Sequence, residues 1–166
     1  MGGVIKVLSR LYVVAGLTIV IFLLIFSGQA FAEFDEWVFE ERIHPMSDED
    51  NSWAGVMTAN GGMLVLRCTG SNDFYILVGF GDYIGDNFTI VDYRFDDNDV
   101  VEAGVWEITP HGSSVFARSE LKNDLIAGFF RSDRVVFQTE DHRGLKPYAE
   151  FPLAGARSAI RQLDCV

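Results

Sequence analysis

The first residues whose types and spacing could do chemistry are the polar run Asp96-Asp97-Asn98-Asp99, because alternating side-chain oxygens can hold calcium. A calcium loop of the EF-hand type also needs an oxygen ligand at its fifth position and Gly at its sixth, and the fifth residue here is Val100. Asp and Asn are equally typical of turns, since their side chains bond nearby backbone amides. We therefore interpret the run as a turn that ends a strand, and residues 48–50 as a solvated acidic loop.

Histidine could ligate a metal, but His44, His111 and His142 fall in predicted loops that are dozens of residues apart. Zinc sites usually contain closely spaced pairs of His or Cys residues, and the sequence has no such pair. We expect no metal site and no cofactor.

A nucleophile or an acid pair is equally hard to find. Ser113 and Ser114 follow His111-Gly112, yet the sequence has no Gly-x-Ser-x-Gly motif. The 24 acidic residues offer many carboxylate pairs for glycoside hydrolysis, and nothing singles out one of them. The sequence therefore predicts no catalytic residue.

Charged residues inside predicted strands suggest a structural role. Strand alternation should send Tyr93 and Phe95 to one face and Arg94 and Asp96 to the other. An arginine paired with a carboxylate across strands would fix their register. We expect a structural charge cluster that draws on Arg94, Asp96 and Arg67.

Cys68 and Cys165 are the only two cysteines. Both lie in the part of the chain that an export signal would carry into an oxidising compartment, so we expect them to pair. A reactive thiol is the alternative, but there is no Cys-x-x-Cys motif. A disulfide here would attach the C-terminus to an early strand.

The elements that must position these residues are mostly strands. Runs rich in β-branched and aromatic residues, separated by turn signals, predict strands at 37–43, 53–59, 63–68, 74–80, 88–95, 105–108, 114–117, 134–139 and 148–153. Asn60-Gly61-Gly62 predicts one hairpin, and the turn around Pro110 and Gly112 predicts a second. The run 74–80 is too continuously apolar for a strand with one solvated face, so we expect it to lie centrally.

Two short helices complete the prediction. Apolar residues recur at helical spacing over 119–130, and again after Gly155. The expected fold is mainly β, an antiparallel β-sandwich-like single domain over 33–166 with two short helices.

The N-terminus is typical of a signal peptide. Lys6 and Arg10 precede the apolar run 11–26, and Ala30-Phe31-Ala32 offers the small residues that signal peptidase reads. We predict cleavage after Ala32 and release into the periplasm. The alternative is an uncleaved inner-membrane anchor over 11–31.

Charge restricts the partners. The net charge of −11 becomes −13 when Lys6 and Arg10 are removed with the signal. Such a field repels nucleic acid and anionic lipid and favours basic protein surfaces. We expect an envelope protein partner, no nucleic acid and no membrane contact after cleavage, and the oligomeric state is left open.

From residue 37 onward the chain resembles the VasI family, also called TagO, of periplasmic proteins associated with type VI secretion. The resemblance is carried, in order, by Pro45-Met46-Ser47-Asp48-Glu49, Leu64-Val65-Leu66-Arg67-Cys68, Tyr93-Arg94-Phe95-Asp96, Trp106, the helix at 121–130, Ala149-Glu150-Phe151-Pro152-Leu153-Ala154-Gly155, Ala159 and Cys165. It implies a β-sandwich-like domain with a Cys68 to Cys165 bridge, export to the periplasm and an accessory role.

The leading functional hypothesis is therefore a non-enzymatic periplasmic accessory or interaction protein. One alternative is an envelope hydrolase or a peptidoglycan- or carbohydrate-binding protein that uses acids such as Asp96 and Asp99. Another is an inhibitor of a basic envelope enzyme, which the acidic charge would favour.

Overall fold

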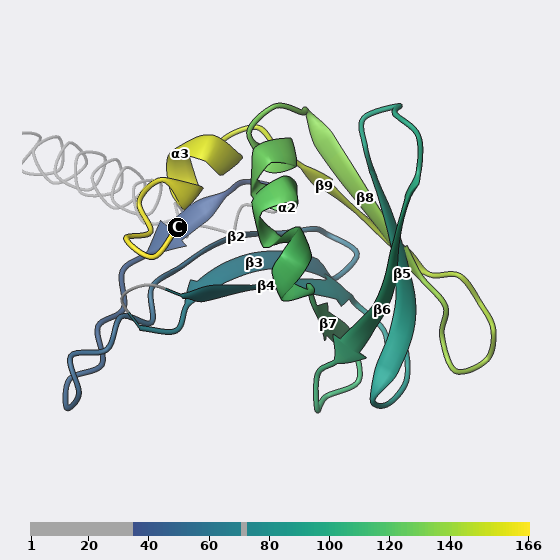
Figure 1. The fold of residues 1–166 in the computed structure, drawn as a ribbon, viewed down its shortest axis with the longest axis horizontal. Coiled ribbons are helices and arrows are strands. Elements are labelled where there is room, and N and C mark those ends of the chain that lie inside the picture. Colours follow the sequence, from purple (N-terminus) through teal and green to yellow (C-terminus); the bar gives the residue numbers. More distant parts are fainter. Residues whose placement is uncertain (1–34, 71–72) are drawn as a thin grey trace, which may run out of the picture. The chain divides into compact units, whose positions relative to one another are not determined.

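Strands whose side chains alternate between buried and accessible build most of this computed structural model, which describes residues 35–70 and 73–166 (Figure 1). The predicted signal peptide and its cleavage site at Ala32 lie outside these residues. Within them the strands are β1 (Val38–Glu40), β2 (Trp53–Met57), β3 (Gly62–Cys68), β4 (Phe74–Phe80), β5 (Phe88–Phe95), β6 (Val101–Ile108), β7 (Ser114–Phe116), β8 (Arg134–Thr139) and β9 (Tyr148–Pro152).

All these strands pair antiparallel in one sheet, in the order β1-β2-β3-β4-β7-β6-β5-β8-β9. The sheet curls until β9, at one edge, packs over β3. A Cβ added at Gly62, the first residue of β3, would lie 3.4 Å from the Phe151 ring and 3.5 Å from Ala149 Cβ. The predicted mainly β, sandwich-like fold is confirmed, and its two layers are halves of one continuous sheet.

The core lies between the two halves. Leu64 and Leu66 of β3 belong to the same buried cluster as Phe137 of β8 and Phe151 of β9, and all four are fully buried. Trp106 packs edge-on against Phe137, with ring centroids 6.0 Å apart. Each such side chain contributes about 1.5–3 kcal/mol through apolar burial, so this layer holds the two halves together.

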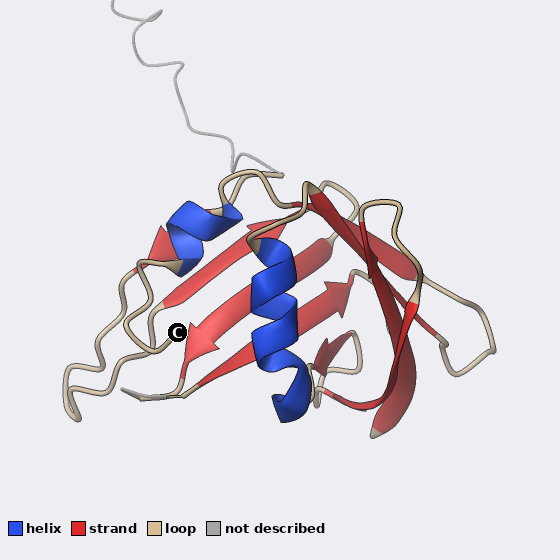
Figure 2. Ribbon diagram, turned by 45° about the horizontal axis from the view of Figure 1, so that its top comes forward, coloured by secondary structure: helices blue, strands red, loops and turns tan. Residues whose placement is uncertain are grey.

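The helices close the same side of the sheet as the core. A short 3-10 turn (η1, Ser119–Leu121) leads into α2 (Lys122–Phe129), and α3 (Ala156–Ile160) follows Gly155. Leu125 and Phe129, one helical turn apart, are the buried residues of α2. Figures 1 and 2 both show α2 and α3 on one side of β2–β4. Neither helix therefore covers the opposite side of these strands.

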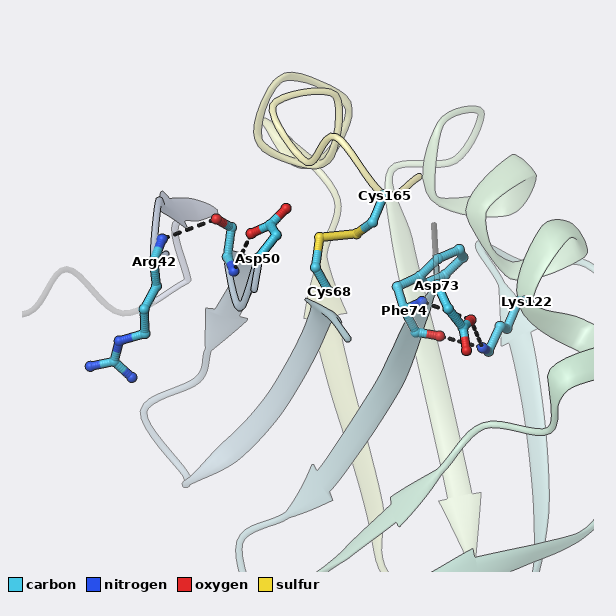
Figure 3. Close-up of a disulfide and its surroundings, with 8 residues drawn as sticks. Arg42, Asp50, Cys68, Asp73, Phe74, Lys122 and Cys165 are labelled. Atoms are coloured by element: carbon cyan, nitrogen blue, oxygen red, sulfur yellow. Dashed lines mark hydrogen bonds and ion pairs between the residues drawn. A yellow bond between two sulfur atoms is a disulfide. The ribbon is translucent and has the colours of Figure 1, made fainter. Parts of the chain in front are cut away.

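Cys68, the last residue of β3, forms a disulfide with Cys165, as predicted (Figure 3). The two Cα atoms are 5.7 Å apart across a sequence separation of 97. Nearby, Lys122 Nζ of α2 lies 3.0 Å from Asp73 Oδ1 and also donates to the Phe74 carbonyl. These contacts attach α2 and the C-terminal tail to the ends of β3 and β4.

Both predicted hairpins are present, and β4, β5 and β8 have the predicted bounds. The main difference is β6, which begins at Val101 rather than at 105. The β5–β6 register shifts between Ile90 and Asp92, and Gly104 adopts φ +78°. A bulge inserts one extra residue into one strand of a pair, so β6 continues through Gly104 to Val101.

Candidate interaction surface

Strand β3 divides its side chains between two very different sides. Leu64, Leu66 and Cys68 point into the core and are fully buried, whereas Met63, Val65 and Arg67 alternate with them and remain partly accessible. In an antiparallel sheet with one face on the core, the other face is normally polar. The side of β3 away from the core is instead largely apolar.

This apolar character extends over neighbouring strands. Cross-strand register sets Val65 beside Leu77 of β4, and Leu77 beside Phe116 of β7. A second row runs from Trp53 of β2 through Arg67 to Tyr75 of β4, whose ring packs edge-on against Phe116 at 5.3 Å between centroids. We call this surface the outer apolar face, and its members are Val38, Trp53, Met57, Met63, Val65, Arg67, Tyr75, Leu77 and Phe116.

No described helix or strand covers the outer apolar face. Its side chains are absent from the set of apolar residues that form or pack on the core, and α2 and α3 lie on the core side. Val38 and Met57, at its margin, are 48% and 52% exposed. Contiguous apolar surface of this kind marks protein or membrane interaction sites in soluble domains.

Arg67 is the one charged residue among the members of the outer apolar face, and two acids adjoin them on the same side of the sheet, Glu40 opposite Trp53 and Glu107 opposite Phe116. Its Nη2 donates to Asn51 Oδ1 at 3.3 Å, and it forms no ion pair within the described part of the chain. The nearest acid in its row is Glu40, beyond Trp53 on β1, and Glu40 pairs with Arg42 at 3.7 Å. Arg67 is thus a guanidinium in an apolar setting with its bidentate hydrogen-bonding capacity largely unused.

A second surface lies on the outward side of β5, β8 and β9. It is a polar hollow of about 410 Å³ lined by the polar residues Asp92, Arg94, Arg134, Gln138, Tyr148 and Glu150. Arg134 binds two carboxylates, Glu150 at 3.1 Å and Asp97 at 2.6 Å. Hydrogen bonding to Glu150, aided by Asp97, raises the pKa of Arg134 above its ordinary value despite partial desolvation. Arg94 makes no ion pair among the described residues, so its charge faces the hollow unneutralised.

The expected cluster of Arg67, Arg94 and Asp96 is wrong. Strands β3 and β5 are not neighbours in the sheet, so Arg67 and Arg94 lie on separate surfaces. Asp96 follows β5 with φ +51°, and its Oδ1 accepts the N–H groups of Asp133 and Arg134 at 3.0 Å each. The cross-strand arginine that binds carboxylates is Arg134. Tyr93 and Phe95 do share a face, as predicted, with ring centroids 5.7 Å apart.

The other residues considered for chemistry lie in loops and turns. Asp96 to Asp99 form a turn after β5, as expected, and Asp99 is exposed. His44 Nδ1 accepts the N–H of Ser47 at 3.2 Å. The His142 ring packs on Tyr83, and the Tyr83 ring also lies against Gly112, the residue after His111. Across residues 35–70 and 73–166, no three His, Cys, Asp or Glu side chains gather as metal ligands would.

Sequence reasoning did not identify the outer apolar face, although a signal for it was present. The continuous apolar run of β4 indicated a strand covered on both sides. The structure covers one side only, within the described residues. Strand β4 thus has more apolar residues than one buried side requires. This excess is the signal in the sequence from which the outer apolar face could have been predicted.

Comparison with protein-family models, with curated proteins and with solved structures found no match to this chain. Among the helices of the described residues, none has the length and apolar character needed to cross a membrane.

Proposed function

We propose that this domain is a non-enzymatic interaction module that acts in the bacterial periplasm by binding another envelope protein through the outer apolar face. The observation that carries the proposal is the apolar, uncovered side of β2, β3, β4 and β7 with Arg67 within it. Removing such a surface from water would favour association by about 25 cal/mol per Å² of apolar area, before the costs of binding.

The outer apolar face contains the residue types that are enriched at the hot spots of protein interfaces. Trp, Tyr, Phe, Met and Arg are enriched at the centres of protein interfaces, and the outer apolar face has Trp53, Tyr75, Phe116, Met63 and Arg67. The partner we propose presents an apolar surface with one carboxylate placed to receive Arg67. A buried guanidinium needs such a partner, because an unpaired charge in a dry interface is costly.

A second copy of this chain is a poorer fit to Arg67. A two-fold contact centred on this face would bring two Arg67 side chains together, and each chain cleaved after Ala32 would carry a net charge of −13. Repulsion from both sources opposes such pairing at low salt. A different protein with a complementary acid avoids both costs.

The cellular setting we propose follows from the family resemblance and from the disulfide. The Cys68–Cys165 bond is compatible with an oxidising compartment such as the periplasm. The resemblance to the VasI family makes a type VI secretion apparatus the first assembly in which to look for the partner. A signal peptide cleaved after Ala32 would deliver the domain there.

The test replaces Arg67 by glutamate in a tagged full chain and isolates its partners from the envelope after in-cell crosslinking. Arg131→Glu is the matched control, because Arg131 is exposed, follows α2 and has no part in the outer apolar face. We expect Arg67→Glu to abolish recovery of the partner and Arg131→Glu to leave it unchanged. Equal recovery with both variants would contradict the proposal, and secretion-apparatus subunits among the partners would support the proposed setting.

A specific feature favours a second candidate function, saccharide binding in the polar hollow. Tyr148 is 61% exposed there, and Gln138, Asp92 and Arg94 offer polar groups beside its ring. Aromatic faces with nearby amide and charged groups are the usual means of holding sugars in proteins. Titration of the full chain with soluble peptidoglycan fragments tests it. Heat of binding that Tyr148→Ala removes would support this function, and no heat at all would exclude it.

A further inference from the structure

Strand β9 lies at an edge of the sheet, with β8 on its only paired side. Leu153 N–H donates to the Asp133 carbonyl at 2.8 Å, and Thr139 N–H donates to the Pro147 carbonyl at 3.0 Å. Backbone groups in an antiparallel pair face the partner strand at every second residue. Residues 147, 149, 151 and 153 therefore face β8, and the backbone groups of Tyr148, Glu150 and Pro152 turn to the free edge.

The free edge is open at two of these three residues. The Pro152 carbonyl accepts the indole N–H of Trp37 at 2.8 Å, which closes one end. The N–H and carbonyl groups of Tyr148 and Glu150 have no hydrogen-bond partner on that side among residues 35–70 and 73–166. The opposite edge of the sheet, β1, has only three residues. Natural sheets usually protect edges, and an open one is a template for another strand.

A hollow runs beside this edge and has an acidic lining. It measures about 610 Å³ and lies between β9 and the β2–β3 turn at Thr58 and Asn60. Asp35, Asp133 and Glu150 line it, and its one basic residue, Arg134, already binds Glu150 and Asp97. The space beside the open backbone groups thus attracts positive charge.

We propose that β9 accepts an extended, basic segment of a partner polypeptide as an additional strand. The segment pairs with the backbone of Tyr148 and Glu150, places a Lys or Arg side chain opposite Glu150, and places an apolar side chain two residues away, opposite Tyr148. Side chains directly opposite each other on neighbouring strands are close enough to interact, which sets this spacing. Backbone pairing supplies affinity and the opposed side chains supply specificity.

A second copy of this chain is disfavoured at this edge too. Two copies that shared it would bring together two Glu150 side chains and two acidic hollows. The proposal goes beyond the interaction module described above, since no residue of the outer apolar face takes part. The two proposals can therefore fail separately.

The test titrates the isotope-labelled full chain with an acetylated heptapeptide of alternating threonine and valine that has one central lysine. Backbone amide signals are followed by NMR. We expect the largest shifts, and the strongest new protection from hydrogen exchange, at the amides of Tyr148 and Glu150. The same peptide with N-methyl groups on its strand-facing amides should not bind, because it cannot complete the backbone pairs.

Reversing the charge at Glu150 tests whether this side chain selects a basic segment. Glu150→Lys should weaken the lysine peptide about tenfold and should strengthen a matched peptide with central glutamate, since like charges brought together are penalised. Glu102→Lys makes the same change of charge on exposed β6 and should leave both affinities unchanged. Binding of the N-methylated peptide, equal loss with both variants, or self-association through Tyr148 and Glu150 would each overturn the proposal. Failure here would leave the Arg67 experiment unaffected.

Discussion

Arg67 of β3 lies directly opposite Tyr75 of β4, on the side of the sheet that faces away from the core. A strand residue in this position has its neighbours in the sequence, Leu66 and Cys68, fully buried on the other side. The two sides of β3 and β4 are therefore both apolar, but only one of them is used by the fold within the described residues. The core side of these strands therefore stabilises the domain, and the outer side is the surface that we propose binds a partner.

Two leucine variants on the two sides test that separation. Leu66→Ala empties a fully buried position and should lower the free energy of unfolding by about 2–5 kcal/mol. Leu77→Ala, on the outer apolar face, should cost about 1 kcal/mol or less, since its site can be filled by water and by neighbouring side chains. Urea denaturation of both variants measures the difference, and equal losses would mean that the outer side is part of the core.

Much of this architecture could be predicted from the sequence because local signals coincide with it. Turn residues such as Asn60-Gly61 bound the strands, and period-2 or continuous apolar runs fill them. The start of β6 was missed because a bulge at Gly104 depends on pairing with β5. The outer apolar face and the polar hollow were missed because both depend on the order of strands in the sheet, which sequence periodicity does not specify. Strand order places Arg134 beside Glu150 and leaves one side of β4 uncovered.

Removal of the disulfide should destabilise the domain substantially. The bond closes a loop with a separation of 97 residues, and in the chain-entropy model such a bond contributes about 2–5 kcal/mol. We expect Cys68→Ser with Cys165→Ser to lower the urea midpoint by a corresponding amount. A reductant should lower the midpoint of the natural chain to that of the double variant and should leave the double variant unchanged. An unchanged midpoint in the double variant would contradict this role.

Gly128→Ala should destabilise the domain, although alanine favours a helix. A Cβ at this position in α2 would lie 2.1 Å from the Phe95 ring, so the helix or the ring must move. Overpacking of this kind costs about 1–3 kcal/mol, against a gain of up to about 1 kcal/mol from helix propensity. Combination with Phe95→Leu should reduce the cost. A stabilised Gly128→Ala variant would show that α2 does not approach Phe95 this closely.

From the contacts of Asp141 we expect a pH-dependent contribution to the free energy of unfolding. It is buried, and its Oδ1 accepts the N–H groups of Arg143 at 2.8 Å and Leu145 at 2.9 Å, while Oδ2 accepts the Arg143 guanidinium at 2.8 Å. Burial alone would raise the pKa of Asp141, but the side chain and backbone of Arg143, together with Leu145, lower it below its ordinary value of 3.8. A carboxyl whose pKa is lowered by folding stabilises the fold above pH 3.8, and the contribution is lost as the pH falls through the lowered value.

Thermal unfolding across pH measures this effect. Asp141→Asn should lower the Tm at pH 7, and the gap to the natural chain should narrow as the pH falls below about 4. Glu140→Gln, a neighbouring exposed acid, serves as the control and should change the Tm little at any pH. A gap that stays constant with pH would show that the Asp141 charge is not responsible.

The most direct test of the proposed interaction module places a photo-reactive phenylalanine at position 75 of the full chain in living cells. Tyr75 lies on the outer apolar face, at the end of the row that runs from Trp53 through Arg67. The matched control is position 162, where Gln162 is exposed beyond α3 on the other side of the sheet. The account predicts one discrete crosslinked envelope protein from position 75 and none from position 162. A crosslink from position 162 alone, or to a second copy of this chain from position 75, would contradict it.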